Sequence, residues 1–212
     1  MRSVTSSSGG RDLRRFAVLG HRAMARGKLP LNDLPGTGGR FDVLVRAMTA
    51  ALLTSHGLRD DVEVVLHLNG GPGPPRRLRL RGEALRGLHA DERSAAGFLG
   101  RALTAPQRPR GQWFEVAPGL DDGGGTLSDT LREWDEATVV VLDAEAPPFQ
   151  QVLHTLSSEG GAEDIAFVLS DDQPLSEHDL PEEVLRASLG DRWMQGHAAV
   201  HIVHWVLDQH AN

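Results

Sequence analysis

A short apolar run near the end of the chain, Ile165 to Leu169, constrains the fold most, because it stops abruptly at Ser170, Asp171 and Asp172. An unbroken run of this length is typical of a β-strand that is covered on both faces of a sheet. In open α/β sheets, ligands bind just beyond the carboxyl ends of the strands. The sequence therefore predicts an α/β fold with a ligand site at this strand end.

The residues that follow predict further walls for the same site. A short apolar piece, Ala187 to Leu189, ends at Gly190, where the backbone can approach a ligand closely. An apolar helix is then expected from Gly196 to Asp208. Two strand ends and one helix entry indicate a small-molecule pocket that is formed largely by backbone.

Apolar runs and helical spacings alternate along the rest of the chain. This alternation is typical of a mostly parallel sheet with helices on both faces. We expect one α/β domain over residues 16–212, and a disordered Ser/Gly/Arg-rich segment over residues 1–15. The expected strands are 16–20, 62–68, 76–81, 113–116 and 137–142, the expected helices are 40–57, 91–103, 126–134, 147–158 and about 177–186, and a turn is expected at 123–125.

Composition narrows the possible chemistry. Cysteine is absent, which excludes thiol nucleophiles, cysteine-bound zinc and disulfides, and which fits a cytoplasmic protein. No apolar run approaches the roughly 18 residues that a membrane-spanning helix needs, so no membrane association is expected. The final predicted helix carries His197, His201, His204 and Asp208 in one stripe. No Glu follows His197, so we interpret the stripe as a polar helix face and expect no metal site.

The net charge of −7 conceals a division between the two halves. Residues 1–110 carry 19 of the 22 Lys and Arg but only 9 of the 29 Asp and Glu, whereas residues 111–212 have a balance of −17. This asymmetry favours a basic half that faces a polyanion, although acidic residues on solvated helices would give the same count. The segment Arg76 to Arg81 alternates Arg and Leu, so we expect a hairpin with an arginine-covered outer face.

One carboxylate stands among arginines in the N-terminal half. Asp42 and Arg46 are spaced i, i+4 and can share one face of the predicted helix, with Arg40 and Arg59 nearby in the sequence. Such a group is either a structural ion pair or a proton acceptor beside guanidiniums that bind phosphate or a base. Arg93 has the same two interpretations. The sequence pattern leaves both open.

Several blocks of the chain resemble the archaeal tRNA pseudouridine N1-methyltransferases, which are members of the SPOUT class. The resemblance extends from about residue 16 to residue 208 and is weakest between 104 and 164. The longest blocks are 33–36 (Asp-Leu-Pro-Gly), 39–46 (Gly-Arg-Phe-Asp-Val-Leu-Val-Arg) and 55–62 (Ser-His-Gly-Leu-Arg-Asp-Asp-Val), and shorter ones are 91–94, 167–171, 188–190, 203–204 and 207–208.

This resemblance implies a SPOUT-like, mostly parallel sheet whose C-terminal chain forms a trefoil knot. It also implies S-adenosylmethionine bound at the knot, and a homodimer with the site near the subunit interface. The chain departs from the family pattern at Ser170 and Asp172, where relatives usually have Gly and His, and at Ala199 and Trp205, where they often have Cys and Asn. The positions that the resemblance assigns to the cofactor are Leu142, Ser170, Ser188, Leu189, Gly190, Asp191, Met194 and Ala199.

The implied activity is N1-methylation of pseudouridine in the T-loop of tRNA, at nucleotide 54. Asp42 is then the candidate that accepts the N1 proton, and Arg40, Arg46, Arg59 and Arg93 are the candidates that bind the RNA. The arginines of the 76–81 hairpin are expected to extend the RNA surface. Two alternatives stay open: methylation of another base or of ribosomal RNA, and a non-catalytic RNA-binding relative.

Overall fold

The computed structural model describes residues 13–158, 164–176, 180–181 and 184–210. Its helices are α1 (Phe41–Leu52), α2 (Glu92–Leu103), α3 (Leu127–Glu133), α4 (Phe149–Ser158) and α5 (Gly196–His210). Its strands are β1 (Leu13–Met24), β2 (Leu53–Thr54), β3 (Gly57–Leu58), β4 (Val62–Gly70), β5 (Arg76–Arg81), β6 (Trp113–Ala117), β7 (Leu120–Gly124), β8 (Thr138–Leu142), β9 (Asp164–Ser170) and β10 (Leu185–Ala187).

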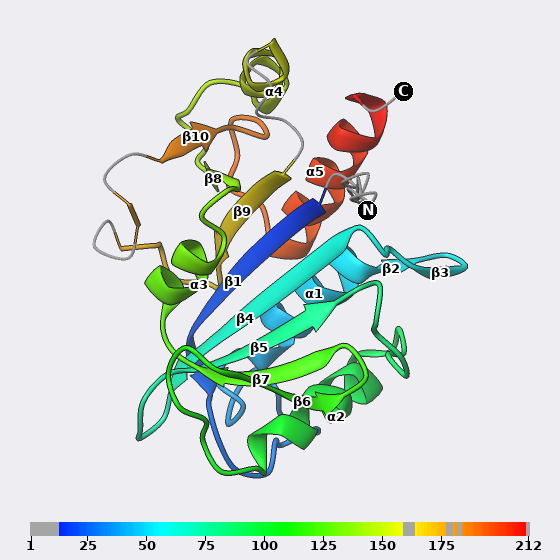
Figure 1. Ribbon diagram of the computed structural model, residues 1–212, viewed down its shortest axis with the longest axis vertical. Coiled ribbons are helices and arrows are strands. Elements are labelled where there is room, and N and C mark those ends of the chain that lie inside the picture. Colours follow the sequence, from blue (N-terminus) through cyan, green and yellow to red (C-terminus); the bar gives the residue numbers. More distant parts are fainter. Residues whose placement is uncertain (1–12, 159–163, 177–179, 182–183, 211–212) are drawn as a thin grey trace, which may run out of the picture.

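One sheet of eight strands organises these elements, in the order β10-β8-β9-β1-β4-β5-β7-β6. The first five of these strands run parallel to one another, and β5, β7 and β6 extend the sheet in antiparallel fashion. Figure 1 shows β1 and β4 at the centre, with α3 in front of the sheet and α1, α2 and α5 behind it. The expected mostly parallel α/β sheet is therefore confirmed. The carboxyl ends of β8, β9 and β10 lie at one edge.

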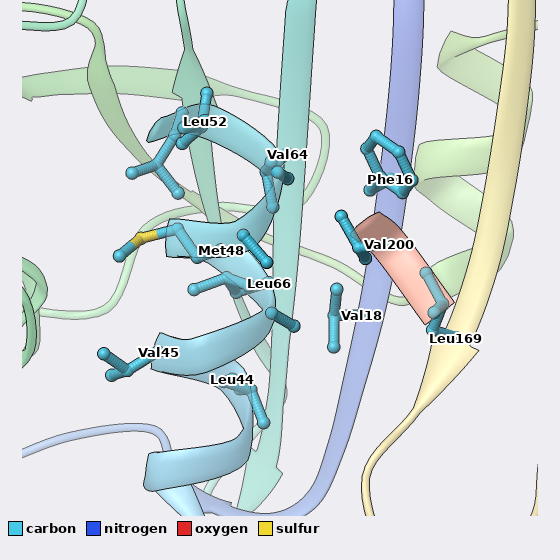
Figure 2. Close-up of a cluster of buried hydrophobic side chains, with 14 of the residues drawn as sticks. Phe16, Val18, Leu44, Val45, Met48, Leu52, Val64, Leu66, Leu169 and Val200 are labelled. Carbon is cyan, nitrogen blue, oxygen red and sulfur yellow. The ribbon is translucent and has the colours of Figure 1, made fainter. Parts of the chain in front are cut away.

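Apolar side chains cover both faces of the sheet, so its central strands are buried on both sides. On one face, α1 and α5 pack against β1, β4 and β9, and Figure 2 shows Phe16, Leu44 and Val200 within this core. On the other face, Leu131 and Trp134 at α3 pack against the alternate residues of the same strands. No helix in the described ranges combines the length and the apolar composition that crossing a membrane requires.

Several predicted boundaries were wrong. Leu13 to Arg15 belong to β1, whereas the other residues of the segment expected to be disordered lie outside the described ranges. The helix expected over 40–57 ends at Leu52, because the chain turns there into the β2–β3 hairpin. The glycines expected to form a turn at 123–125 instead complete β7 at Gly124. The helix expected near 177–186 falls partly outside the described residues, and its last part is the strand β10.

The prediction that arginines cover the outer face of the hairpin was also wrong, although the hairpin itself is present. Strands β4 and β5 pair in antiparallel fashion, but Arg76 and Arg77 are fully buried. Arg76 Nε donates to Asp122 Oδ1 at 2.7 Å, and Arg77 Nη1 donates to the Thr130 hydroxyl at 2.9 Å. Asp121 Oδ2 forms ion pairs with both Arg79 and Arg81. The acidic half of the chain thus pairs with all four hairpin arginines, of which Arg79 and Arg81 stay partly exposed.

The histidine stripe of α5 is not uniformly polar surface. His204 is buried, and its Nε2 lies 3.0 Å from the carbonyl oxygen of Ala51, so Nε2 carries the hydrogen that it donates. Its Nδ1 then accepts from Arg14 Nη1 at 3.2 Å. Burial, with the positive charges of Arg59 and Arg14, lowers the pKa of His204 to about 3. This neutral imidazole fastens α5 to the last turn of α1.

Candidate functional site

A cavity of about 570 Å³ lies where the carboxyl ends of β8 and β9, the segment after β10 and the first turn of α5 meet. Its walls include six of the eight residues predicted to bind the cofactor. The other two lie nearby: Ser188 sits behind the wall, where its hydroxyl accepts from Gly190 N at 3.0 Å, and Asp191 is exposed beside it. The six residues in the walls are Leu142, Ser170, Leu189, Gly190, Met194 and Ala199.

Backbone geometry explains why these residues surround the cavity. Strand β10 pairs with β8, so Ala187 and Leu142 end side by side. Gly190 has a φ of 131°, a conformation that side chains rarely permit. No heavy atom lies within 4 Å of the position that a Cβ would take on Gly190. The turn is therefore open on the side where a ligand can contact main-chain atoms.

Four carboxylates lie in the cavity wall; Asp171 and Asp172 were noted at the predicted strand end, whereas Asp143 and Glu145 were missed from the sequence. Asp143 and Glu145 follow β8 directly, as Asp171 and Asp172 follow β9. The strand-end rule applied to Ser170 would have found them if it had been extended past Leu142. Asp143 is paired with Arg186 at 3.1 Å, so part of the acidic charge is balanced locally. Glu145 is exposed and forms no ion pair within the described ranges, so it is the carboxylate of the wall most available to a hydroxyl or ammonium group.

Asp171 holds a histidine that sequence reasoning also missed. One carboxylate oxygen accepts from the backbone N of His21 at 2.8 Å, and the other lies 2.9 Å from its Nδ1. Asp171 N donates to the carbonyl of Leu19 at 2.8 Å, so the loop after β9 is fixed to the end of β1. The Asp171 side chain is completely inaccessible to solvent. These contacts fix one rim of the cavity.

The predicted ion-pair group around Asp42 is present at the start of α1. Asp42 is only 5% exposed, and its Oδ1 accepts from Arg40 Nε at 3.2 Å, while Arg46 donates to Oδ2. Arg40 has a φ of 63° and is the one non-glycine residue with a positive φ in the described ranges. Such a conformation costs about 1–3 kcal/mol and persists only where its surroundings enforce it.

Arg40 also joins this group to the cavity. Its Nη1 donates to Asp172 Oδ2 at 3.0 Å, and Arg22 Nη2 reaches the same oxygen at 2.5 Å. The hydrogen bond from Arg22, together with the charges of Arg22 and Arg40, lowers the pKa of Asp172 below its usual range. Asp172 therefore stays ionised and forms part of both the cavity wall and the arginine cluster.

A further imidazole lies at the same place. Burial and the positive charge of Arg46 lower the pKa of His197, in the first turn of α5. The ring is therefore predominantly neutral near pH 7. The stripe spacing that drew attention to His197 gave no sign that it lies near Arg46 of α1. Among the described residues, no three His, Asp or Glu side chains gather in a way that could hold a metal ion.

Two predicted RNA-binding residues lie apart from Asp42. Arg59 pairs with Asp208 through two hydrogen bonds of 3.2 and 2.7 Å, and its N donates to the carbonyl of Leu52, at the far end of α1. At a rise of about 1.5 Å per residue, this places Arg59 roughly 15 Å from Asp42 along the helix. Arg93, in the first turn of α2, donates to the Asn32 side chain.

Comparison with known proteins agrees with this architecture. A family model described as SAM-dependent RNA methyltransferase (SAM is S-adenosylmethionine) matches residues 13–211. The chain belongs to this RNA methyltransferase family. The match spans every strand and helix described above, including the cavity and the Asp42 group.

Curated members of the RNA methyltransferase family are similar over most of the chain. A tRNA (pseudouridine(54)-N(1))-methyltransferase from Methanospirillum hungatei is 40% identical over 178 residues, which cover 82% of this chain and 86% of that protein. The protein of the same name from Methanocella arvoryzae is 36% identical, with 93% of this chain and 100% of that protein covered.

Among solved structures, this RNA methyltransferase family member is similar to Archaeoglobus fulgidus Nep1 bound to S-adenosylhomocysteine. The TM-score is 0.61 at 16% identity, and the alignment covers 95% of this chain and 100% of the Nep1 chain. At this level of identity the likeness speaks to the fold alone, and it agrees with the α/β architecture predicted from the sequence.

The cavity fits the methyl donor that the RNA methyltransferase family uses. Its volume of about 570 Å³ falls within the range of about 300–1,000 Å³ that is usual for small-molecule sites. Val141, Leu175 and Leu189 supply apolar walls, whereas Asp143 and Glu145 offer carboxylates. An apolar surface with a few polar groups suits a purine ring that carries a ribose and an amino-acid tail.

Proposed function

We propose that this protein methylates N1 of pseudouridine in the T-loop of tRNA, at nucleotide 54, with S-adenosylmethionine as methyl donor. The observation that carries the proposal is the contact between the cavity and the Asp42 group, because Arg40 bonds both Asp172 in the cavity wall and Asp42. A cofactor cavity and a proton acceptor are thus adjacent. The names of the relatives from Methanospirillum and Methanocella support the choice of substrate.

The methyl donor would occupy the cavity against Leu142, Ser170, Leu189, Gly190 and Met194. When bound, S-adenosylmethionine supplies an activated methyl group: the carbon–sulfur bond breaks as the carbon joins ring N1, and the N1 proton leaves. Walls that hold the methyl group in line with ring N1 would account for a large part of the rate in such transfers.

Asp42 accepts the N1 proton or stabilises the charge that remains on the ring. Each carboxylate oxygen has two lone pairs, so Asp42 can take a further hydrogen bond while Arg40 and Arg46 hold its oxygens. The two guanidiniums keep the carboxylate in one orientation, and their remaining N–H groups can donate to a uracil carbonyl or a phosphate. Arg93 lies farther out and would contact the RNA backbone.

We also propose that the C-terminal chain forms a trefoil knot. The segment after β10 lies against the loop after β8: Asp143 N donates to the Ala187 carbonyl, Ser188 N to the Pro147 carbonyl, and Phe149 N to the Ser188 carbonyl. We also propose a homodimer. Its support is the outer face of α5, where the Trp205 side chain is 61% exposed.

The activity can be tested with tRNA transcripts that carry pseudouridine or uridine at nucleotide 54. Each transcript is incubated with the protein and methyl-labelled cofactor, and the nucleosides are then identified by mass spectrometry. We expect N1-methylpseudouridine from the first transcript and none from the second. A parallel incubation contains ribosomal RNA. Label in another nucleoside of the transcripts, or only in ribosomal RNA, would favour methylation of another base or of ribosomal RNA.

A separate measurement addresses the non-catalytic alternative. We expect calorimetry to detect binding of S-adenosylhomocysteine to the isolated protein, and Gly190→Val, which forces a branched side chain into an unsuitable backbone conformation, to weaken it. RNA binding without any cofactor binding by the unchanged protein would point to an RNA-binding relative that has lost catalysis.

A further inference from the structure

The hairpin expected to bind RNA carries arginines that are neutralised internally, so the free positive charge lies elsewhere. Arg26, Lys28 and Arg101 are exposed, and within the described part of the chain none of them forms an ion pair with a carboxylate. All three belong to the segment after β1 or to α2. Their positions relative to each other follow from the way in which these two segments pack.

Residues 25–33, here called the strap, run along α2 in the opposite direction. Gly27 N donates to the carbonyl of Leu103 at the end of the helix. Leu29 lies 3.5 Å and Leu31 3.8 Å from the positions that Cβ atoms would take on Gly100 and Gly97, respectively. Asn32 then receives the hydrogen bond of Arg93 in the first turn. The strap is thus in register with α2 from one end to the other.

This register places four cations along one ridge. Arg93 and Arg101 are eight residues apart on α2, with Gly97 midway, which corresponds to a rise of about 12 Å and a rotation of about 80°, so the two arginines flank the line along which Gly97 meets the strap. Arg26 and Lys28 flank Gly27, which is bonded at the end of the helix where Arg101 lies. We call Arg26, Lys28, Arg93 and Arg101 the cationic ridge.

The carboxylates near the ridge have local partners. Asp33 accepts from the backbone N of Gly36 and Thr37 at 3.1 and 2.8 Å, and Asp91 caps α2 by accepting from Ser94 N at 2.8 Å. Glu92 lies 3.9 Å from Arg46. These contacts hold the negative charges at the loop and at the helix start, so that Lys28 and Arg101 remain available to an external anion.

One end of the ridge adjoins the candidate site. Arg46 contacts Asp42 on α1 and also Glu92, next to Arg93 on α2. A chain of phosphates that passes along the ridge would therefore reach the start of α1 beside Asp42. Phosphate contacts set the position of a nucleic acid on a protein surface without reading its bases.

We propose that the cationic ridge binds the sugar–phosphate backbone of the RNA substrate next to the nucleotide that is methylated. This inference rests on the proposed function and adds the surface along which the RNA lies. The ridge fixes the orientation of the RNA, whereas the cavity and Asp42 act on the base.

The test compares the full-length protein with the variant Lys28→Gln/Arg101→Gln. Binding of pseudouridine-containing tRNA is measured by fluorescence anisotropy over a range of salt concentrations, and methylation gives KM and kcat. Arg86→Gln is the matched control, because Arg86 is exposed, forms no ion pair within the described ranges and is not one of the ridge residues; its backbone N donates to the Pro118 carbonyl before β7. Circular dichroism verifies that each variant is folded.

We expect the double variant to bind tRNA about tenfold more weakly at moderate salt, and the slope of log affinity against log salt to fall by about 1.4–1.8. KM for tRNA should rise while kcat and the affinity for S-adenosylhomocysteine stay close to the unchanged protein. A folded double variant with the original slope and KM would refute the role proposed for the cationic ridge but not the proposed function. Absence of any RNA binding or methylation by the unchanged protein would overturn the proposed function as well.

Discussion

Arg40 and Asp172 stand 132 positions apart in the sequence, and an ion pair of 3.0 Å joins them at the cavity wall. Because Arg40 also bonds Asp42, a carboxylate that faces the cavity and the proposed proton acceptor share one guanidinium. Any change at Asp172 is therefore transmitted to Asp42 through a single side chain, which makes this pair a sensitive point for mutation.

Asp172→Asn should lower kcat while leaving the protein stable. Asn keeps one acceptor but loses the charge that orients Arg40, and partly exposed ion pairs contribute only about 0–1 kcal/mol to stability. Turnover and urea unfolding are measured together. The control is Arg22→Gln, which removes the other partner of Asp172 and leaves Arg40 in place; an equal loss of kcat in both variants would count against a special role for Arg40.

Asp42→Asn should reduce kcat by about 10²–10⁴, the usual contribution of a positioned acid or base. Asn preserves the shape and one oxygen acceptor, so S-adenosylhomocysteine should bind as before in calorimetry. Single-turnover methylation of tRNA gives the rate of the chemical step. Unchanged turnover would leave Asp42 as a structural ion-pair partner only.

Two buried histidines predict a loss of stability in mild acid. Burial lowers the pKa of His67 to about 3, and the pKa of His204 is also lowered to about 3. Between that value and the ordinary 6.5, the unfolded chain binds protons that the folded protein does not, so the free energy of unfolding rises with pH. Each histidine contributes a slope of up to about 1.4 kcal/mol per pH unit.

His67→Leu isolates one of these contributions. Neither ring nitrogen of His67 has a hydrogen-bond partner among the described residues, so Leu should raise stability and remove about half of the acid-dependent slope. Urea unfolding at pH 5, 6 and 7.5 measures both effects. Burial raises the pKa of Glu63, so this group changes stability with pH in the opposite direction. Because both proteins contain Glu63, its contribution cancels when their slopes are compared. Equal slopes in the two proteins would refute the assignment.

Arg76→Met should cost about 3–5 kcal/mol, because it leaves Asp122 buried beside one weaker partner, Arg108, at 3.4 Å. The double variant Arg76→Met/Asp122→Leu should recover part of this loss, since both charges are then absent. A double-mutant cycle by urea unfolding gives the coupling. Additive single effects would mean that the pair contributes no interaction energy.

Trp193 should report cofactor binding by fluorescence. Its side chain is 78% exposed and forms part of the cavity rim, so a ligand in the cavity changes its surroundings. Titration with S-adenosylhomocysteine should alter the emission of the unchanged protein, and Trp193→Phe should abolish the change. Trp205→Phe is the control, because Trp205 is 61% exposed and lies outside the cavity wall.

Local patterns predicted most of the elements because buried apolar residues recur in the sequence with the period of a helix or a strand. The run ending at Leu169 marked β9, and the i, i+4 spacing of Asp42 and Arg46 marked a contact that the structure contains. The β7 strand was mistaken for a turn because Asp122 and Gly123 are turn residues in isolation. Arginines from β5 neutralise the aspartates of β7, and no local rule contains that information.

The candidate site was predictable only in part for the same reason. Gly190 and Ser170 could be found from strand ends, which are local features. Contacts such as His21 with Asp171 depend on which strands become neighbours in the sheet. Helical and strand periodicities carry no information on that choice, so the rim of the cavity and the course of the strap became visible only in the assembled fold.

The central position of β1 has a consequence for the way in which this chain reaches its native state. His21 and Asp171 bond across 150 positions, and β1 has β9 as one of its two neighbours. Strand β1 is synthesised first, and it therefore cannot pair with β9 until most of the chain has been made. Topologies dominated by such distant pairings fold slowly. Refolding from denaturant should be slow for a protein of this size, and the unpaired edge of β1 would be exposed to aggregation until β9 arrives.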